Sequence, residues 1–185
     1  TEDSSASDAL TRAAPFAGSR DRDITMPWTP ELVYADADQA LGHCGPLFSV
    51  IWRQNTTREG ARRLADSFRQ WATAGQARHG LVTIIEADAP LPDPSAREDV
   101  AKFLQSISDE VVVSTVVFEG SGFKSAAVRG VVTGLTLLAK QAYPHRVFAT
   151  VEEASEWFAK EAPADWHMSP GGFVKAVQGI RRLVP

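Results

Sequence analysis

The fold of this chain is decided by two apolar runs, Gly80-Leu-Val-Thr-Ile-Ile85 and Val111-Val-Val-Ser-Thr-Val-Val-Phe118. Both are too short to cross a membrane and are rich in β-branched residues, which favours buried strands. Segments with the helical spacing of apolar residues lie before, between and after them, over 61–72, 100–107 and 126–138. Strands that alternate with helices are typical of a mostly parallel sheet covered by helices, so the pattern predicts an α/β fold.

The same pattern extends in both directions from these runs. Upstream, 39–44 and 47–52 are predicted to pair as an antiparallel hairpin around a turn at Gly45 and Pro46. Downstream, a last strand at 145–149 leads into a helix. The predicted order is β-β-α-β-α-β-α-β-α, followed by one more helix at the C-terminal end. We expect that helix to fold back and cover exposed sheet or helix surface; the alternative is that its basic, amphipathic surface binds a partner or an anionic membrane.

Four residues with hydroxyl groups are predicted to begin helices by accepting hydrogen bonds from free backbone N–H groups: Thr57, Ser95, Thr150 and Ser169. At Ser95 and Thr150, a glutamate three residues later completes the pattern of a capping box. The helix from about Lys124 to Gln141 is different because its apolar residues encircle it. That distribution predicts burial on more than one side.

Composition predicts three regions in the chain and argues against some classes of function. Residues 1–26 are polar and are predicted to be a disordered tail, 27–162 an α/β domain, and 163–185 a helical extension. A net charge of −4 argues against nucleic-acid binding. One cysteine excludes internal disulfides. No signal peptide or membrane-spanning segment is recognisable, so we expect a cytoplasmic protein without integral membrane association.

The block Pro144-His-Arg-Val-Phe-Ala-Thr-Val-Glu-Glu-Ala-Ser-Glu-Trp-Phe158 resembles the ending of the STAS domain, and in particular its bacterial SpoIIAA-like, or STAS/SEC14-type, relatives. The segments Val116-Val-Phe-Glu-Gly-Ser-Gly-Phe123 and Ala126-Ala-Val-Arg-Gly130 are also similar to that group. The resemblance implies a regulatory module that acts through protein contacts. It also implies that Ser95, which follows an Asp-x-Ser pattern, is phosphorylated; the alternative is that Ser95 only caps its helix.

A second group of candidates lies where strands end. The loop Glu119-Gly120-Ser121-Gly122 follows a strand and begins a helix, where open α/β sheets bind ligands; the alternative is a tight turn. Glu86 and Asp88 are candidates for a carboxylate pair, or for a solvated loop. Arg129, within an apolar helix, is predicted to pair with a carboxylate such as Glu119; the alternative is an anion clamp.

No residue pattern predicts a metal or a cofactor, because the four histidines are scattered. His43 and Cys44 are adjacent on a strand and therefore point to opposite faces, which argues against a nucleophile with its base. Cys44 is predicted to be a small core residue.

Three functions follow in order of preference. The first is a non-enzymatic regulatory or scaffolding module, and exposed apolar residues such as Trp166 and Phe173 are candidates for a homodimer contact. The second is a carrier of a small molecule or lipid, with an apolar pocket beside the helix at 124–141; the alternative there is tight packing. The third is an enzyme that uses the strand-end residues.

Overall fold

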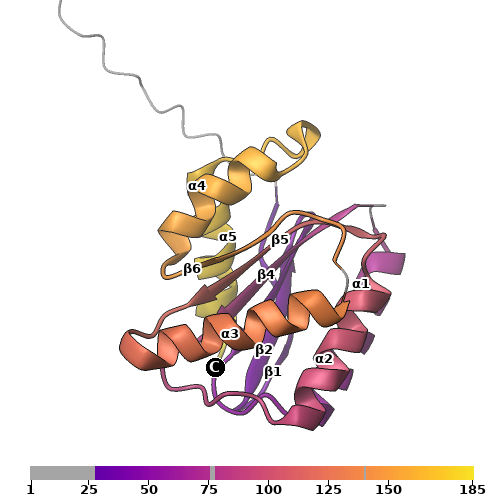
Figure 1. Ribbon diagram of the computed structural model, residues 1–185. Coiled ribbons are helices and arrows are strands. Elements are labelled where there is room, and N and C mark those ends of the chain that lie inside the picture. Colours follow the sequence, from indigo (N-terminus) through magenta and orange to yellow (C-terminus); the bar gives the residue numbers. More distant parts are fainter. Residues whose placement is uncertain (1–27, 76–77, 140) are drawn as a thin grey trace, which may run out of the picture.

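The computed structural model describes residues 28–75, 78–139 and 141–185, and the predicted tail at 1–26 lies outside them. The described part is an α/β structure, as predicted, with one six-stranded sheet and five α-helices (Figure 1). The elements in chain order are β1 (Glu31–Ala35), β2 (Gln39–Cys44), β3 (Leu47–Trp52), α1 (Arg58–Thr73), β4 (His79–Ile85), α2 (Pro94–Ser106), β5 (Val111–Phe118), α3 (Gly122–Ala139), β6 (His145–Phe148), α4 (Val151–Glu161), a 3-10 turn (Ala164–Trp166) and α5 (Pro170–Leu183).

The six strands lie in the sheet in the order in which they occur in the chain. β1, β2 and β3 pair antiparallel, and every pair from β3 to β6 is parallel, which confirms the predicted hairpin and parallel strands. The turn between β2 and β3 is also the predicted one. Gly45 has a φ of 57° there, and a Cβ at this position would lie 2.2 Å from the Trp28 ring. A side chain is therefore excluded both by backbone conformation and by space.

The helices form two layers. The strands from β3 to β6 are added in one direction, and crossovers of this kind share one handedness, so α1, α2 and α3 cover the same face. α4 and α5 cover the opposite face (Figure 1). We refer to these as the α1–α3 face and the α4–α5 face.

The α4–α5 face is filled by fully buried side chains. The rings of Phe158 and Phe173 lie 4.8 Å apart, between α4 and α5. Trp166, just before α5, is 4% exposed, and Phe173 is 0% exposed. The predicted homodimer contact through Trp166 and Phe173 is therefore wrong. The apolar positions of α5 face the sheet, so their helical spacing reflects the core of the chain itself.

The α1–α3 face has two parts. Under α1 and α2 it is aromatic: the ring of Phe68 meets Phe48 and Phe103 edge to face, with centroids 5.3 and 5.6 Å apart. Under α3 the described residues include one buried ring, Phe118, and Val128 and Val132 pack with it and Val116 on β5. The two parts meet between α2 and α3.

α3 is not buried on more than one side, so that prediction is wrong. Leu137 and Leu138 are 74% and 66% exposed. The helix lies over β5 and the short edge strand β6, and the described part of the chain places nothing over these two leucines. In residues 28–75, 78–139 and 141–185, no helix combines the length and apolarity needed to cross a membrane.

Three of the four predicted caps are confirmed. Thr57, Thr150 and Ser169 each accept a hydrogen bond from a backbone N–H three residues later. The exception is α2, which begins two residues earlier than predicted: the Asp93 side chain, and not Ser95, caps it by accepting a hydrogen bond from the Ala96 N–H at 2.8 Å.

Ser95 therefore lies inside α2, and the capping box predicted for it is wrong. Its Oγ donates to the Asp93 carboxylate at 2.7 Å. Glu98 pairs with Lys102 on the helix surface. The reason is Pro94, which fits the first helical position and so leaves the capping position to Asp93.

Candidate functional site

An apolar cavity lies between the sheet and helices α2 and α3, with a volume of about 80 Å³. One water needs roughly 10–15 Å³ on the same measure, so the cavity is larger than a packing defect. Leu91 lines it and is also 40% exposed, which marks the side that is open to solvent. No charged residue is among those that line it: Trp52, Thr56, Leu64, Leu81, Thr83, Ile85, Pro90, Leu91, Pro92, Val100, Phe103, Leu104, Ser114, Thr115, Val116, Val128, Val131, Val132, Leu135 and His145.

The cavity lies where small side chains of the sheet and of α3 face each other beside α2. On the sheet, Thr83, Ser114 and Val116 face this space, and none of them is long enough to fill it. On α3 the facing residues include Val128 and Val131, which are short and branched. Trp52 and Phe103 border the cavity from the α1–α2 part of this face, and the α3 residues that line it are all Val or Leu.

A hydrogen-bonded pair of polar side chains, Ser114 and His145, lies on the sheet side of the cavity. Ser114 of β5 and His145 of β6 are direct partners across parallel strands, so their side chains project from the same face. The Ser114 Oγ and the His145 Nδ1 lie 2.6 Å apart. The His145 Nε2 is buried and has no hydrogen-bond partner in the part of the chain that the structure describes. Burial lowers the pKa of His145 to about 4, so the imidazole is neutral at pH 7.

The position of His145 is fixed by neighbouring bonds of the same two strands. The Ser114 N–H donates to the Pro144 carbonyl at 2.9 Å. On the other face of β5, the Thr115 hydroxyl donates to the Arg146 carbonyl at 3.0 Å. β6 is thus held on both sides of His145, although it has only four residues.

The Ser114–His145 pair is better suited to hydrogen bonding than to proton abstraction. A general base works best with a pKa near the operating pH, and His145 lies well below that. Ser114 is 2% exposed, which also limits its use as a nucleophile. The pair therefore offers a fixed polar group in an apolar cavity.

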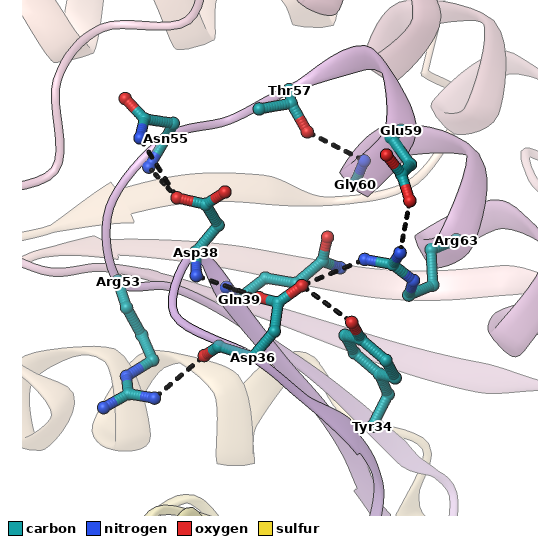
Figure 2. A network of polar contacts seen from close by, with 10 residues as sticks. All are labelled: Tyr34, Asp36, Asp38, Gln39, Arg53, Asn55, Thr57, Glu59, Gly60 and Arg63. Atoms are coloured by element: carbon teal, nitrogen blue, oxygen red, sulfur yellow. Dashed lines mark hydrogen bonds and ion pairs between the residues drawn. The ribbon is translucent and has the colours of Figure 1, made fainter.

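A second network joins the turn after β1 to the start of α1 (Figure 2). The Asp36 carboxylate accepts hydrogen bonds from the Tyr34 hydroxyl at 2.7 Å and from Arg63 at 3.1 Å. Burial raises the pKa of Asp36, but the hydrogen bonds from Tyr34 and the backbone outweigh it and hold the pKa below its usual value. Arg53 and Asn55 bond to the same turn, which anchors the segment that carries Thr56 to the end of the cavity.

The strand-end residues predicted from sequence are only partly brought together. Glu86 and Glu119 line one hollow with Arg53 and Arg181, at the ends of β4 and β5. Glu119 pairs with Arg181 at 2.7 Å, so the predicted pairing of Arg129 with Glu119 is wrong. α5 brings Arg181 to this edge, which the sequence pattern did not indicate.

The other predicted strand-end residues lie elsewhere. Arg129 is exposed on α3 and lines a different hollow with Arg146. Asp88 is exposed in the loop after β4. Gly120, Ser121 and Gly122 form the turn into α3, with Gly122 at a φ of 67°.

The remaining candidates have structural surroundings. His43 stacks on Trp71 on the α1–α3 face, and Cys44 lies in the core of the α4–α5 face, so the two side chains point apart, as predicted. Burial raises the pKa of the Cys44 thiol to about 11. Within the described residues, no three His, Cys, Asp or Glu side chains are grouped so as to hold a metal ion.

Sequence reasoning missed the role of Ser114 and treated His145 only as a potential metal ligand. The available signal was a hydroxyl residue inside the run Val111–Phe118, where a buried strand normally carries apolar side chains. Such a residue needs a partner, and the nearest one across the next parallel strand is His145.

Comparisons of the chain with protein-family models, with curated proteins and with solved structures found no match. The resemblance to the STAS domain therefore stays a prediction.

Proposed function

We propose that this protein binds a small apolar molecule, without transforming it, in the cavity between the sheet and helices α2 and α3. The observation that carries the proposal is the cavity itself, which lies beside α3 in a domain whose opposite face is filled. Apolar cavities that remain unfilled cost stability, and a ligand recovers the lost contacts. A role as a carrier of a small molecule is therefore preferred to the regulatory role that the resemblance implied.

The size and lining of the cavity define a suitable probe. Its walls are mostly Val, Leu, Ile and Pro, and they contain no charge. Burial of apolar ligand surface in such walls contributes about 25 cal/mol per Å². Ethylbenzene is a probe that offers apolar surface and no hydrogen-bonding group.

The test is an NMR titration of the full chain with ethylbenzene, followed through valine and leucine methyl signals. We expect the methyl groups of Val128, Val131 and Leu135 to shift on binding. In Val131→Phe the new ring fills the cavity, and binding is lost. Leu137→Phe is the matched control, because Leu137 is 74% exposed on the same helix and the variant retains binding. Shifts confined to surface methyl groups, or equal binding by both variants, would contradict the proposal.

A second candidate is the regulatory role through protein contacts, with a cytoplasmic location. The observation that favours it is the exposed pair Leu137 and Leu138 on α3, since large exposed apolar residues often mark contact surfaces. The test is capture of partners from native lysate by wild type and by the double variant Leu137→Asp/Leu138→Asp. A stoichiometric partner that is lost only in the variant supports this role; capture that is equal with both proteins removes it.

Phosphorylation of Ser95 belongs to this second candidate. The Asp93 carboxylate accepts the Ser95 hydroxyl hydrogen, so a phosphate there would repel Asp93 and loosen the start of α2. Mass spectrometry of the protein from its native cell tests the modification directly, and unmodified Ser95 under all growth conditions would remove it.

A further inference from the structure

We propose that His145, held in place by Ser114, anchors the ligand, so that the cavity selects apolar molecules that carry one uncharged hydrogen-bond acceptor. Ketones, esters and amides have this chemistry. The inference rests on the proposed function, because it assigns the ligand class of the same cavity. It is carried by a buried polar atom that has no partner among the described residues and belongs to a residue lining a mostly apolar cavity.

The first step is the geometry of the imidazole. Its Nδ1 is turned to the Ser114 Oγ, 2.6 Å away. Its Nε2 is the remaining polar atom of the ring, and it is buried without a partner. Buried polar side-chain atoms are nearly always hydrogen-bonded in folded proteins. Because His145 lines the cavity, a molecule bound there is the partner that Nε2 lacks.

The second step is the position of the proton. If the Ser114 hydroxyl donates to Nδ1, the only unsatisfied donor of the pair is the N–H at Nε2. If Nδ1 donates to Ser114, both the hydroxyl hydrogen and the Nε2 lone pair lack a partner. The first arrangement leaves fewer buried groups unsatisfied, so we assign the proton to Nε2. The ligand must then supply an acceptor.

The third step is charge. Among the described residues, no Lys, Arg, Asp or Glu lines the cavity, so none of these side chains compensates a buried ionic group. Burial keeps the imidazole neutral at pH 7, so it does not supply a positive charge either. A carboxylate would lose its hydration without an ion pair, whereas a carbonyl loses less and gains the Nε2 hydrogen bond. The acceptor is therefore uncharged.

The experiment compares three probes of similar shape: ethylbenzene, acetophenone and benzoate. Acetophenone differs from ethylbenzene by its carbonyl, and benzoate carries a charge. Each is titrated into wild type and into His145→Phe at pH 7. The two neutral probes differ in their hydration, so their Kd values are not compared directly. For each protein, the Kd of ethylbenzene is divided by the Kd of acetophenone. The informative quantity is the double ratio, which is this value for wild type divided by the value for the variant.

We expect this double ratio to favour acetophenone by about tenfold, the size of one hydrogen bond that satisfies a buried donor. A second measurement needs no variant: the imidazole ¹⁵N signals of His145 report the proton on Nε2, and they shift with acetophenone but not with ethylbenzene. Ser114→Ala, which frees the ring to turn, is expected to lose part of the preference for acetophenone over ethylbenzene.

Three outcomes would overturn the inference. Binding of both neutral probes with an unchanged double ratio and unmoved imidazole signals would refute the anchor and leave the proposed function intact. Tighter binding of benzoate than of acetophenone would refute the uncharged acceptor. Failure of all three probes to bind wild type would refute the proposed function, and the anchor with it.

Discussion

The two faces of the sheet are built from similar residues but are filled differently. Alternate residues of β5 illustrate this: Val113 and Val117 point into the filled core under α4 and α5, whereas Ser114 and Val116 line the cavity. One strand thus contributes to a closed core on one side and to an open one on the other. The closed face therefore contributes more to stability. The open face contributes less, and its unfilled space can hold a ligand.

Large-to-small substitutions should show the largest difference in stability between the two faces. Phe158→Ala, on the α4–α5 face, is expected to lower the free energy of unfolding by about 3–5 kcal/mol, because a fully buried ring leaves a large cavity. Leu135→Ala, on the α1–α3 face, should cost about 1 kcal/mol, since Leu135 is only partly buried and already borders unfilled space. Urea unfolding measures both. Equal losses would mean that the two faces are equally packed.

Acid should lower the free energy of unfolding through His145, which lies on the α1–α3 face. The pKa of His145 is lowered by burial to about 4, against about 6.5 in the unfolded chain, so the unfolded state takes up a proton first as the pH falls. Stability that is fully present above pH 6.5 is therefore lost toward pH 4, by about 3 kcal/mol from this one group.

The control for this prediction is His145→Phe, which cannot take up the proton. Burial also lowers the pKa values of His43 and His79, which lie on the same face, and both remain in the variant. The difference in unfolding free energy between wild type and variant should therefore change with pH. A difference that is constant from pH 7 to pH 4 would contradict the assignment.

Added volume should have opposite effects on the two faces. Val113→Leu, in the filled core, is expected to cost about 1–3 kcal/mol through overpacking. Val128→Leu, beside the cavity, should be neutral or stabilise by up to about 1 kcal/mol, because the added methylene group enters empty space. The same variant should weaken ethylbenzene binding. Thermal unfolding and the NMR titration check the two effects, and destabilisation by both variants would argue that the cavity does not persist in solution.

The smallest effects concern the starts of two helices. Asp93→Ala removes the cap of α2, and Thr150→Ala removes the cap of α4, each at a cost of about 1 kcal/mol. Ser95→Ala should change stability by less than about 0.5 kcal/mol. Only Asp93→Ala should also reduce ligand affinity, because α2 forms a wall of the cavity. A larger loss in Ser95→Ala than in Asp93→Ala would restore Ser95 as the cap.

The sequence was sufficient for elements that depend on local chemistry. The β-branched runs correctly predicted parallel strands, and Thr57, Thr150 and Ser169 correctly predicted the starts of helices. Asp93-Pro-Ser95 offered two good capping residues, and only the preference of proline for the first helical position separates them. The apolar residues around α3 led to the wrong prediction that it is buried on more than one side, because composition does not show how many elements pack against a helix.

The candidate site was beyond local reasoning. Ser114 and His145 meet only through the register of β5 and β6, which is a property of the whole sheet. The cavity depends on how α2 and α3 pack on the sheet and on the small residues between them, and the same residues would be predicted for a filled core. The pairing of Glu119 with Arg181 likewise requires α5 to return to the sheet.

That return of α5 has a consequence for the order in which the protein folds. Each strand after β1 pairs with the strand made just before it, so the sheet can grow while the chain is being synthesised. α5 packs back on β1 and β2 from the far end of the described chain. The face that becomes the most tightly packed is therefore the last to be covered. We expect chaperones at the ribosome to contact the nascent chain there, on the side that carries Cys44, until α5 closes over it.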